Sequence, residues 1–165
     1  MLRKILLVIF IMTIPTIVSA ANWSLAIRPG VSEGKTAIGL GVRKDINDYF
    51  ESNLGKITFA AEGDIDYWAN EDAFAFSVSP VLRYTFKTYG FQPYIEGGIA
   101  LAALTDKEVH RRELGESFLF RDYAGLGLIF GNFSTALNFV HFSNAGLDEQ
   151  NDGINIYSIN LNYHF

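Results

Sequence analysis

The sequence predicts an all-β protein, an eight-stranded antiparallel up-and-down transmembrane β-barrel, and three observations support this prediction. First, apolar and polar residues alternate with period two in segment after segment, as in strands whose two faces meet different surroundings. Second, turn residues separate these segments at fairly even intervals. Third, the chain after position 21 contains no apolar run of the roughly 18 to 20 residues that a transmembrane helix needs.

The first twenty residues have the three zones of a secretory signal peptide: a positively charged start, an apolar run and small residues near the end. We therefore expect cleavage after Ala20 or Ala21. The chain then divides into a signal peptide over 1–20 and a single barrel over 21–165.

The composition argues against several classes of protein. The chain has 18 acidic and 13 basic residues, two of the basic ones in the leader, so the mature barrel carries a net charge of roughly −7. This charge disfavours a nucleic-acid partner. The chain has no cysteine, and therefore no disulfide and no thiolate site. No spacing of histidines and carboxylates demands a metal, so we expect neither a metal nor another cofactor.

Clusters of turn residues define the ends of the strands. These breaks lie at 29–30 with 32–34, and at 51–55, 69–72, 87–90, 105–116, 131–132 and 144–153. The eight strands between them are expected, in chain order, at 22–31, 36–50, 56–68, 73–86, 92–104, 117–130, 134–143 and 154–165.

The third strand shows most clearly which side chains face inward. One of its faces is mainly large and apolar, with Ile57, Phe59, Ala61, Ile65 and Tyr67. The other face carries Glu62, Asp64 and Asp66. The interior of an eight-stranded barrel is only just wide enough for packed side chains, so we expect the small and charged residues inside. Arg83 is available there to offset the three carboxylates.

A soluble barrel would place its large apolar side chains inside and its charges outside. The strands at 73–86 and 154–165 alternate as the third strand does, and their bulky, aromatic-rich faces fit an outward apolar band. This arrangement is typical of a bacterial outer-membrane barrel. With both termini in the periplasm, the two longest connections, 105–116 and 144–153, are expected on the extracellular side.

A polar pair interrupts the lipid-facing side of the seventh strand. His141 and Ser143 share a face with Leu137 and Phe139, near the extracellular end. They are either interfacial polar residues at a strand end or a base and a nucleophile, because an imidazole that accepts a hydroxyl proton activates that oxygen. Asn144 and the backbone around Gly146 are candidate oxyanion donors.

The chain resembles the PagL-type lipid A deacylases, which are eight-stranded outer-membrane esterases. The resemblance rests on His141-Phe142-Ser143-Asn144-Ala145-Gly146-Leu147 and on Asn151-Asp152-Gly153-Ile154. It implies removal of an ester-linked hydroxyacyl chain from lipid A, with lipid A and the outer membrane as partners. It further implies a base at His141, a nucleophile at Ser143, an oxyanion donor at Asn144 and supporting roles for Phe120, Asp122 and Asn151.

The sequence departs from the family pattern at one catalytic position. Where the family has a glutamate as the third member of the triad, this chain has Asn155. Asn155 shares the outward face of Tyr157, so a hairpin can place it beside His141. Its amide oxygen can orient the imidazole but adds no negative charge. Glu149 and Asp122 are alternative sources of a carboxylate.

Several further features receive simpler interpretations. His164 is expected to be packed inside at the periplasmic end, and the basic residues of 107–112 to form a solvated loop. A non-catalytic small barrel with a structural or adhesion role is the alternative to an esterase. A homodimer is compatible with the sequence but is not specified by it.

Overall fold

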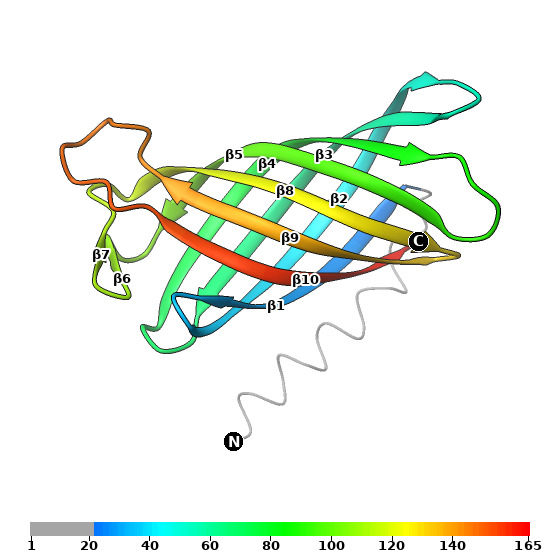
Figure 1. Ribbon diagram of the computed structural model, residues 1–165. Helices are drawn as coiled ribbons and strands as arrows, with labels where there is room; N and C mark the ends of the chain where they lie inside the picture. Colours follow the sequence, from blue (N-terminus) through cyan, green and yellow to red (C-terminus); the bar gives the residue numbers. More distant parts are fainter. Residues whose placement is uncertain (1–21) are drawn as a thin grey trace.

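The computed structural model describes residues 22–165, so the predicted signal peptide and its cleavage point lie outside the described residues. Eight antiparallel strands close into a barrel in the order β1-β10-β9-β8-β5-β4-β3-β2, with a separate two-stranded sheet, β6-β7 (Figure 1). The strands are β1 (Trp23–Ser32), β2 (Lys35–Glu51), β3 (Gly55–Trp68), β4 (Ala73–Phe86), β5 (Gln92–Leu104), β6 (Glu108–Val109), β7 (Arg112–Glu113), β8 (Phe118–Phe130), β9 (Phe133–Ser143) and β10 (Ile154–His164). Among residues 22–165 no helix is long and apolar enough to span a membrane.

All eight predicted strands are present, with bounds that differ from the expected ones by one residue at most. The short hairpin β6–β7 within the expected loop 105–116 was not predicted. Its two-residue turn has positive φ at His110 (55°) and Arg111 (63°). Glycine and asparagine normally signal such a turn, and neither is present at these two positions, so no local pattern predicts it.

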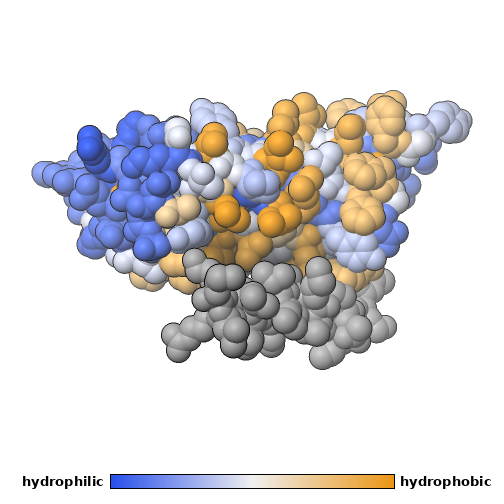
Figure 2. Space-filling model, turned by 90° about the horizontal axis from the view of Figure 1, so that it is seen from below, coloured by the Kyte–Doolittle hydropathy of each residue, from blue (hydrophilic) through white to orange (hydrophobic). Residues whose placement is uncertain are grey.

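The two faces of the wall differ as the alternation predicts. Along β9, Leu137 and Phe139 point outward with 67% and 40% of their surface exposed, whereas Asn138 and Val140 are buried. A hydrophobic band covers the middle of the visible surface, and hydrophilic residues gather at the end that carries the β6–β7 hairpin (Figure 2). The outward band therefore matches the expected lipid-facing surface.

The charged groups inside the barrel pair differently from the prediction for Arg83. Arg28 binds Glu62 and Asp64, and Arg121 binds Asp66 at 2.8 Å between Nε and Oδ2. Arg83 lies directly opposite Glu96 on the neighbouring strand and pairs with it at 2.8 Å. The expectation that Arg83 offsets the β3 carboxylates was therefore wrong, because its cross-strand neighbour is a closer acid.

The hairpin β6–β7 ties the loops together at one end of the barrel, which we call the loop end. His110 Nδ1 and Lys35 Nζ contact the Glu71 carboxylate at 3.0 and 2.9 Å. Arg112 pairs with Glu33 at 3.3 Å. The basic residues of this hairpin thus bind carboxylates of the β1–β2 and β3–β4 connections.

The interior is apolar just beneath this hairpin. Val109 and Leu114 of the β6–β7 region are fully buried in one cluster with Trp68, Phe142 and Ile154. The rings of Trp68 and Phe142 pack edge to face at 5.4 Å. The loop end is therefore held by an apolar core as well as by ion pairs.

Candidate active site

Three neighbouring strands of the wall, β8, β9 and β10, bring the polar candidates together near the loop end (Figure 1). His141 on β9 lies in register with Asn155 on β10 on one side and with Asp122 on β8 on the other. All three side chains are partly exposed on the outer surface. Phe142, which follows His141 along β9, is buried. The outward direction expected for His141 and Asn155 is the one observed.

Asn155 fixes the orientation and the tautomer of the imidazole. Its Oδ1 lies 2.7 Å from His141 Nδ1. Because an amide oxygen can only accept, the Nδ1–H of His141 donates this hydrogen bond. In the neutral ring the proton is then on Nδ1, which leaves Nε2 free to accept a proton.

Ser143 lies two residues from His141 on the same face of β9, in register with Phe120 on β8. In the part of the chain that the structure describes, no hydrogen bond joins Ser143 to His141. Neighbours of this kind on a strand are roughly 7 Å apart along the chain. Rotation about the side-chain bonds can bring the hydroxyl and Nε2 closer, and such pairs are often loose without substrate.

Asn144 organises the loop 144–153 from a fully buried position. Its Nδ2 donates to the carbonyl oxygens of Leu114 at 3.1 Å and Gln150 at 2.7 Å, and its Oδ1 accepts from the Gly146 N–H at 2.8 Å. Its own N–H donates to Asn151 Oδ1 at 3.0 Å. The N–H groups considered as oxyanion donors are thus all engaged within the protein.

The two carboxylates considered as partners of His141, Asp122 and Glu149, lie in different places. Asp122 is beside His141 in register, whereas Glu149 is an exposed loop residue. Within residues 22–165 neither forms a hydrogen bond to His141, whose Nδ1 is taken by Asn155. Of these three candidates, all within the described residues, Asn155 is the one that forms a hydrogen bond with His141.

Sequence reasoning missed the contribution of the 105–117 segment. The Leu114 carbonyl accepts from the Asn144 side chain, and the backbone of Gly115 lies against it: a Cβ built on Gly115 would be 2.9 Å from Asn144 Nδ2. These residues precede the motif by about thirty positions, so no local pattern links them to it. Gly115 has a positive φ of 75°, and a glycine at this position is the signal of a constrained turn that the sequence contains there.

Two apolar grooves run along the outer wall. One, of about 520 Å³, begins next to the candidate site and is lined by Ile95, Ala124, Leu126, Leu137, Phe139 and Tyr157 together with backbone of the same strands. Phe139 is two residues from His141 on the same face of β9, so this groove starts beside the imidazole.

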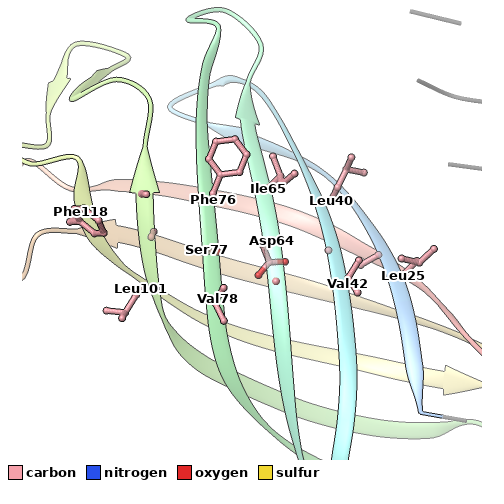
Figure 3. Close-up of a pocket in the computed structure, with 15 residues that line it drawn as sticks. Leu25, Leu40, Val42, Asp64, Ile65, Phe76, Ser77, Val78, Leu101 and Phe118 are labelled. Atoms are coloured by element: carbon pink, nitrogen blue, oxygen red, sulfur yellow. The ribbon is translucent and has the colours of Figure 1, made fainter. Parts of the chain in front are cut away.

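The second groove, of about 580 Å³, crosses β1 to β5 and ends at Phe118 on β8. Figure 3 shows Leu40, Ile65 and Phe76 among the side chains that line it. Its walls are almost entirely apolar, and it contains none of the residues discussed above as a base or nucleophile. We interpret it as lipid-facing surface.

The remaining histidine, His164, lies at the opposite end of the barrel from His141. It is partly buried, and its Nε2 is 2.9 Å from Ser134 Oγ. Among the described residues no group of three or more histidine, cysteine or acidic side chains is placed to hold a metal ion.

Comparison with known proteins gives a consistent family. A family model described as "Lipid A 3-O-deacylase (PagL)" matches residues 36–164. The "Lipid A deacylase PagL" of Pseudomonas aeruginosa is 35% identical over 146 residues, which cover 85% of this chain and 84% of that protein. The protein of the same name from Bordetella bronchiseptica is 29% identical over 121 residues, covering 70% and 67% respectively.

Solved structures agree with the sequence comparisons. The "Crystal structure of the outer membrane enzyme PagL" matches with a TM-score of 0.82 and 30% identity, covering 86% of this chain and 99% of that chain. The N-terminal β-barrel domain of Pseudomonas aeruginosa OprF matches with a TM-score of 0.50 and 15% identity, covering 87% and 97%. The second likeness concerns the fold alone.

Proposed function

Because the chain belongs to the PagL family of lipid A 3-O-deacylases, we propose that it is an outer-membrane esterase that removes an ester-linked hydroxyacyl chain from lipid A. The observation that carries this proposal is the His141–Asn155 hydrogen bond on the outer wall, two residues from Ser143. A base with a free Nε2 beside a hydroxyl on a lipid-facing surface fits ester hydrolysis in the membrane.

In the proposed reaction, Ser143 Oγ attacks the ester carbonyl while its proton moves to His141 Nε2. The new Oγ–C bond gives a tetrahedral intermediate. Its collapse breaks the bond to the sugar oxygen, which leaves with the proton from His141. Water then attacks the acyl-enzyme with His141 again as the base. This step releases the free fatty acid and regenerates Ser143, whose Oγ regains the proton from His141.

Asn155 supports this reaction through orientation alone. Its oxygen holds the Nδ1–H, so the imidazole presents Nε2 to Ser143. An amide does not stabilise the imidazolium by charge, and replacing the aspartate of a serine-protease triad by asparagine costs about 10⁴ in turnover. We therefore expect slow but measurable deacylation unless Asp122 or Glu149 supplies the charge during the reaction.

The groups that stabilise the oxyanion are expected in the loop that begins at Asn144. We propose that the N–H groups of Asn144 and Gly146 turn from their present partners, Asn151 Oδ1 and Asn144 Oδ1, toward the developing oxyanion. Ala145 between them has a positive φ of 53°, a conformation that is unfavourable for a residue with a Cβ. Such local strain is often found at functional turns.

Lipid A reaches this site sideways from the outer leaflet. The groove of about 520 Å³ beside His141 takes the acyl chain, because its outward side chains are apolar and open to the membrane. Phe120, in register with Ser143, adds an apolar side chain beside the proposed nucleophile. The reaction needs no cofactor, and a homodimer is not required by it.

The proposal is tested by mass spectrometry of lipid A from cells with and without the protein. The expected product lacks one hydroxyacyl chain. Unchanged lipid A would contradict the enzyme and favour a non-catalytic barrel with a structural or adhesion role. Purified protein acting on lipid A in detergent micelles distinguishes direct hydrolysis from an indirect effect on the cells.

A further inference from the structure

Gly153 is the last residue before β10, and its backbone lies against the imidazole of His141. A Cβ placed on Gly153 would be 2.8 Å from His141 Cε1, 3.5 Å from its Nε2 and 3.3 Å from the Phe142 carbonyl oxygen. The first distance is shorter than real contacts of a Cβ. Gly153 itself is buried, so its α-carbon fills this space.

We propose that Gly153 is a positioning residue for His141, an inference that rests on the proposed esterase function. The hydrogen bond to Asn155 holds the imidazole at Nδ1. The backbone of Gly153 lies against the Cε1 side of the ring, where a Cβ would be 2.8 Å from Cε1. Two contacts on different edges fix the rotation of the ring, whereas the hydrogen bond alone would allow it to pivot. Gly153 thereby keeps Nε2 directed toward Ser143.

Two independent features of the backbone place Gly153 there. Its φ is +60°, a conformation that favours glycine. The preceding residue, Asp152, is joined to Glu113 of β7 by two hydrogen bonds, from Asp152 N–H to the Glu113 carbonyl and from Glu113 N–H to Asp152 Oδ2, both 3.0 Å. The hairpin β6–β7 therefore helps to hold the backbone of Gly153 in place beside the imidazole.

The matched control for Gly153→Ala is Gly131→Ala. Gly131 has the same φ of +60° but nothing lies within 4 Å of a Cβ built on it. Both substitutions carry the same backbone strain, and only Gly153→Ala also pushes on the imidazole. A difference between the two variants therefore reports the contacts of the added Cβ, the shortest of which is with His141, and not the strained backbone.

The first measurement is NMR of the full-length mature barrel in detergent, labelled with ¹⁵N at histidine. Wild type is expected to show His141 as the Nδ1–H tautomer, with a nuclear Overhauser contact between its Hε1 and a Gly153 Hα. Gly153→Ala is expected to shift the His141 nitrogen signals toward a mixture of tautomers. Gly131→Ala is expected to leave them in place.

The second measurement is the kinetics of lipid A deacylation. Displacing a base by about 1 Å costs on the order of 10² in rate, so Gly153→Ala is expected to lower kcat by that factor and to leave KM unchanged. Gly131→Ala is expected to match wild type in both constants.

The outcomes separate this inference from the proposed function. If wild-type protein is active but lacks the Hε1–Hα contact, the role of Gly153 is overturned and the esterase function is not. This test uses wild type, so it does not depend on whether Gly153→Ala folds. Unchanged His141 signals together with lowered kcat would also overturn it. Wild type that shows the contact but leaves lipid A intact would refute the esterase, and the positioning role with it.

Discussion

Two polar regions of this barrel, the interior and the outer wall near His141, differ in how their charge is balanced. Inside, each described arginine binds a carboxylate: Arg28 and Arg121 bind acids of β3, and Arg43 and Arg83 share Glu96. On the outer wall, a neutral amide, Asn155, holds the imidazole. In the interior the arginines and carboxylates neutralise one another, whereas at the outer site no carboxylate of residues 22–165 is bound to the imidazole.

This difference indicates which polar groups serve the fold and which serve the chemistry. Buried charges persist only when they are paired, so the interior pairs follow from the requirement to fill a narrow lumen. Polar groups on a lipid-facing wall gain nothing for packing and are costly there. A base that faces lipid beside a hydroxyl is therefore best explained by reactivity. The predictions below test this contrast from the largest expected effect to the smallest.

The largest effect is expected on the outer wall. Ser143→Ala or His141→Ala should abolish deacylation, a loss of at least about 10⁴ in rate, because each removes a reacting group. The fold should survive, since both side chains are partly exposed and outside the packed lumen. Rates on lipid A and the heat-dependent shift of the barrel in gel electrophoresis measure the two properties. Wild-type activity in either variant would refute the assigned site.

The second effect is a gain of function at Asn155. Asn155→Glu should restore an anionic partner for the imidazolium and raise the initial rate by at most roughly 10⁴. Glu149→Ala and Asp122→Ala, measured in the same detergent, show whether either carboxylate already provides this charge. If one of them does, its alanine variant should be slow and Asn155→Glu should change little. Equal rates for all three variants and wild type would reduce the triad to a Ser/His dyad.

The third effect is on stability and belongs to the interior. Arg121→Met should destabilise the barrel by about 3–5 kcal/mol, because it leaves Asp64 and Asp66 without this partner. Arg112→Met is the matched control, since its pair with Glu33 is solvent-exposed and worth about 1 kcal/mol at most. Urea unfolding in lipid vesicles measures both. Similar losses for the two variants would contradict the contrast between buried and exposed pairs.

The smallest effect concerns pH at the loop end. Hydrogen bonds from His110 and then Lys35 lower the pKa of Glu71. A carboxyl group with a lowered folded-state pKa stabilises the fold above its unfolded-state pKa, and this contribution disappears as pH falls through the folded-state value. Acidification below about pH 4 should therefore loosen the loop end.

Hydrogen–deuterium exchange of residues 105–117, corrected for intrinsic rates, measures this loosening. Exchange in wild type should increase between neutral and acidic pH. Glu71→Gln should already exchange faster at neutral pH and should change less on acidification. The same pH response in both proteins would show that another group controls the loop end.

Alternation and turn residues were sufficient to predict the barrel, because outward and inward positions along each strand meet such different surroundings. The contact between His141 and Asn155 was predictable for a related reason: a hairpin with both residues near its connecting loop and facing outward pairs them directly. The main polar contact of the site could therefore be predicted from the sequence.

Features set by the register of distant strands or by loop conformation were not predictable in this way. Arg83 pairs with Glu96 because of the β4–β5 register, which no local pattern specifies. The β6–β7 turn uses His110 and Arg111 in place of the usual glycine. The burial of Asn144 depends on Leu114, about thirty residues earlier in the chain. Each depends on tertiary structure.

The filled lumen decides where the second reactant comes from. Side chains and the apolar cluster beneath β6–β7 occupy the interior, so bulk solvent has no route through the barrel to the outer wall. In the proposed mechanism, the water that cleaves the acyl-enzyme therefore comes from the headgroup layer. For the proposed nucleophile Ser143, the depth relative to that layer is then expected to govern the lifetime of the acyl-enzyme, which a thicker or more ordered leaflet should prolong.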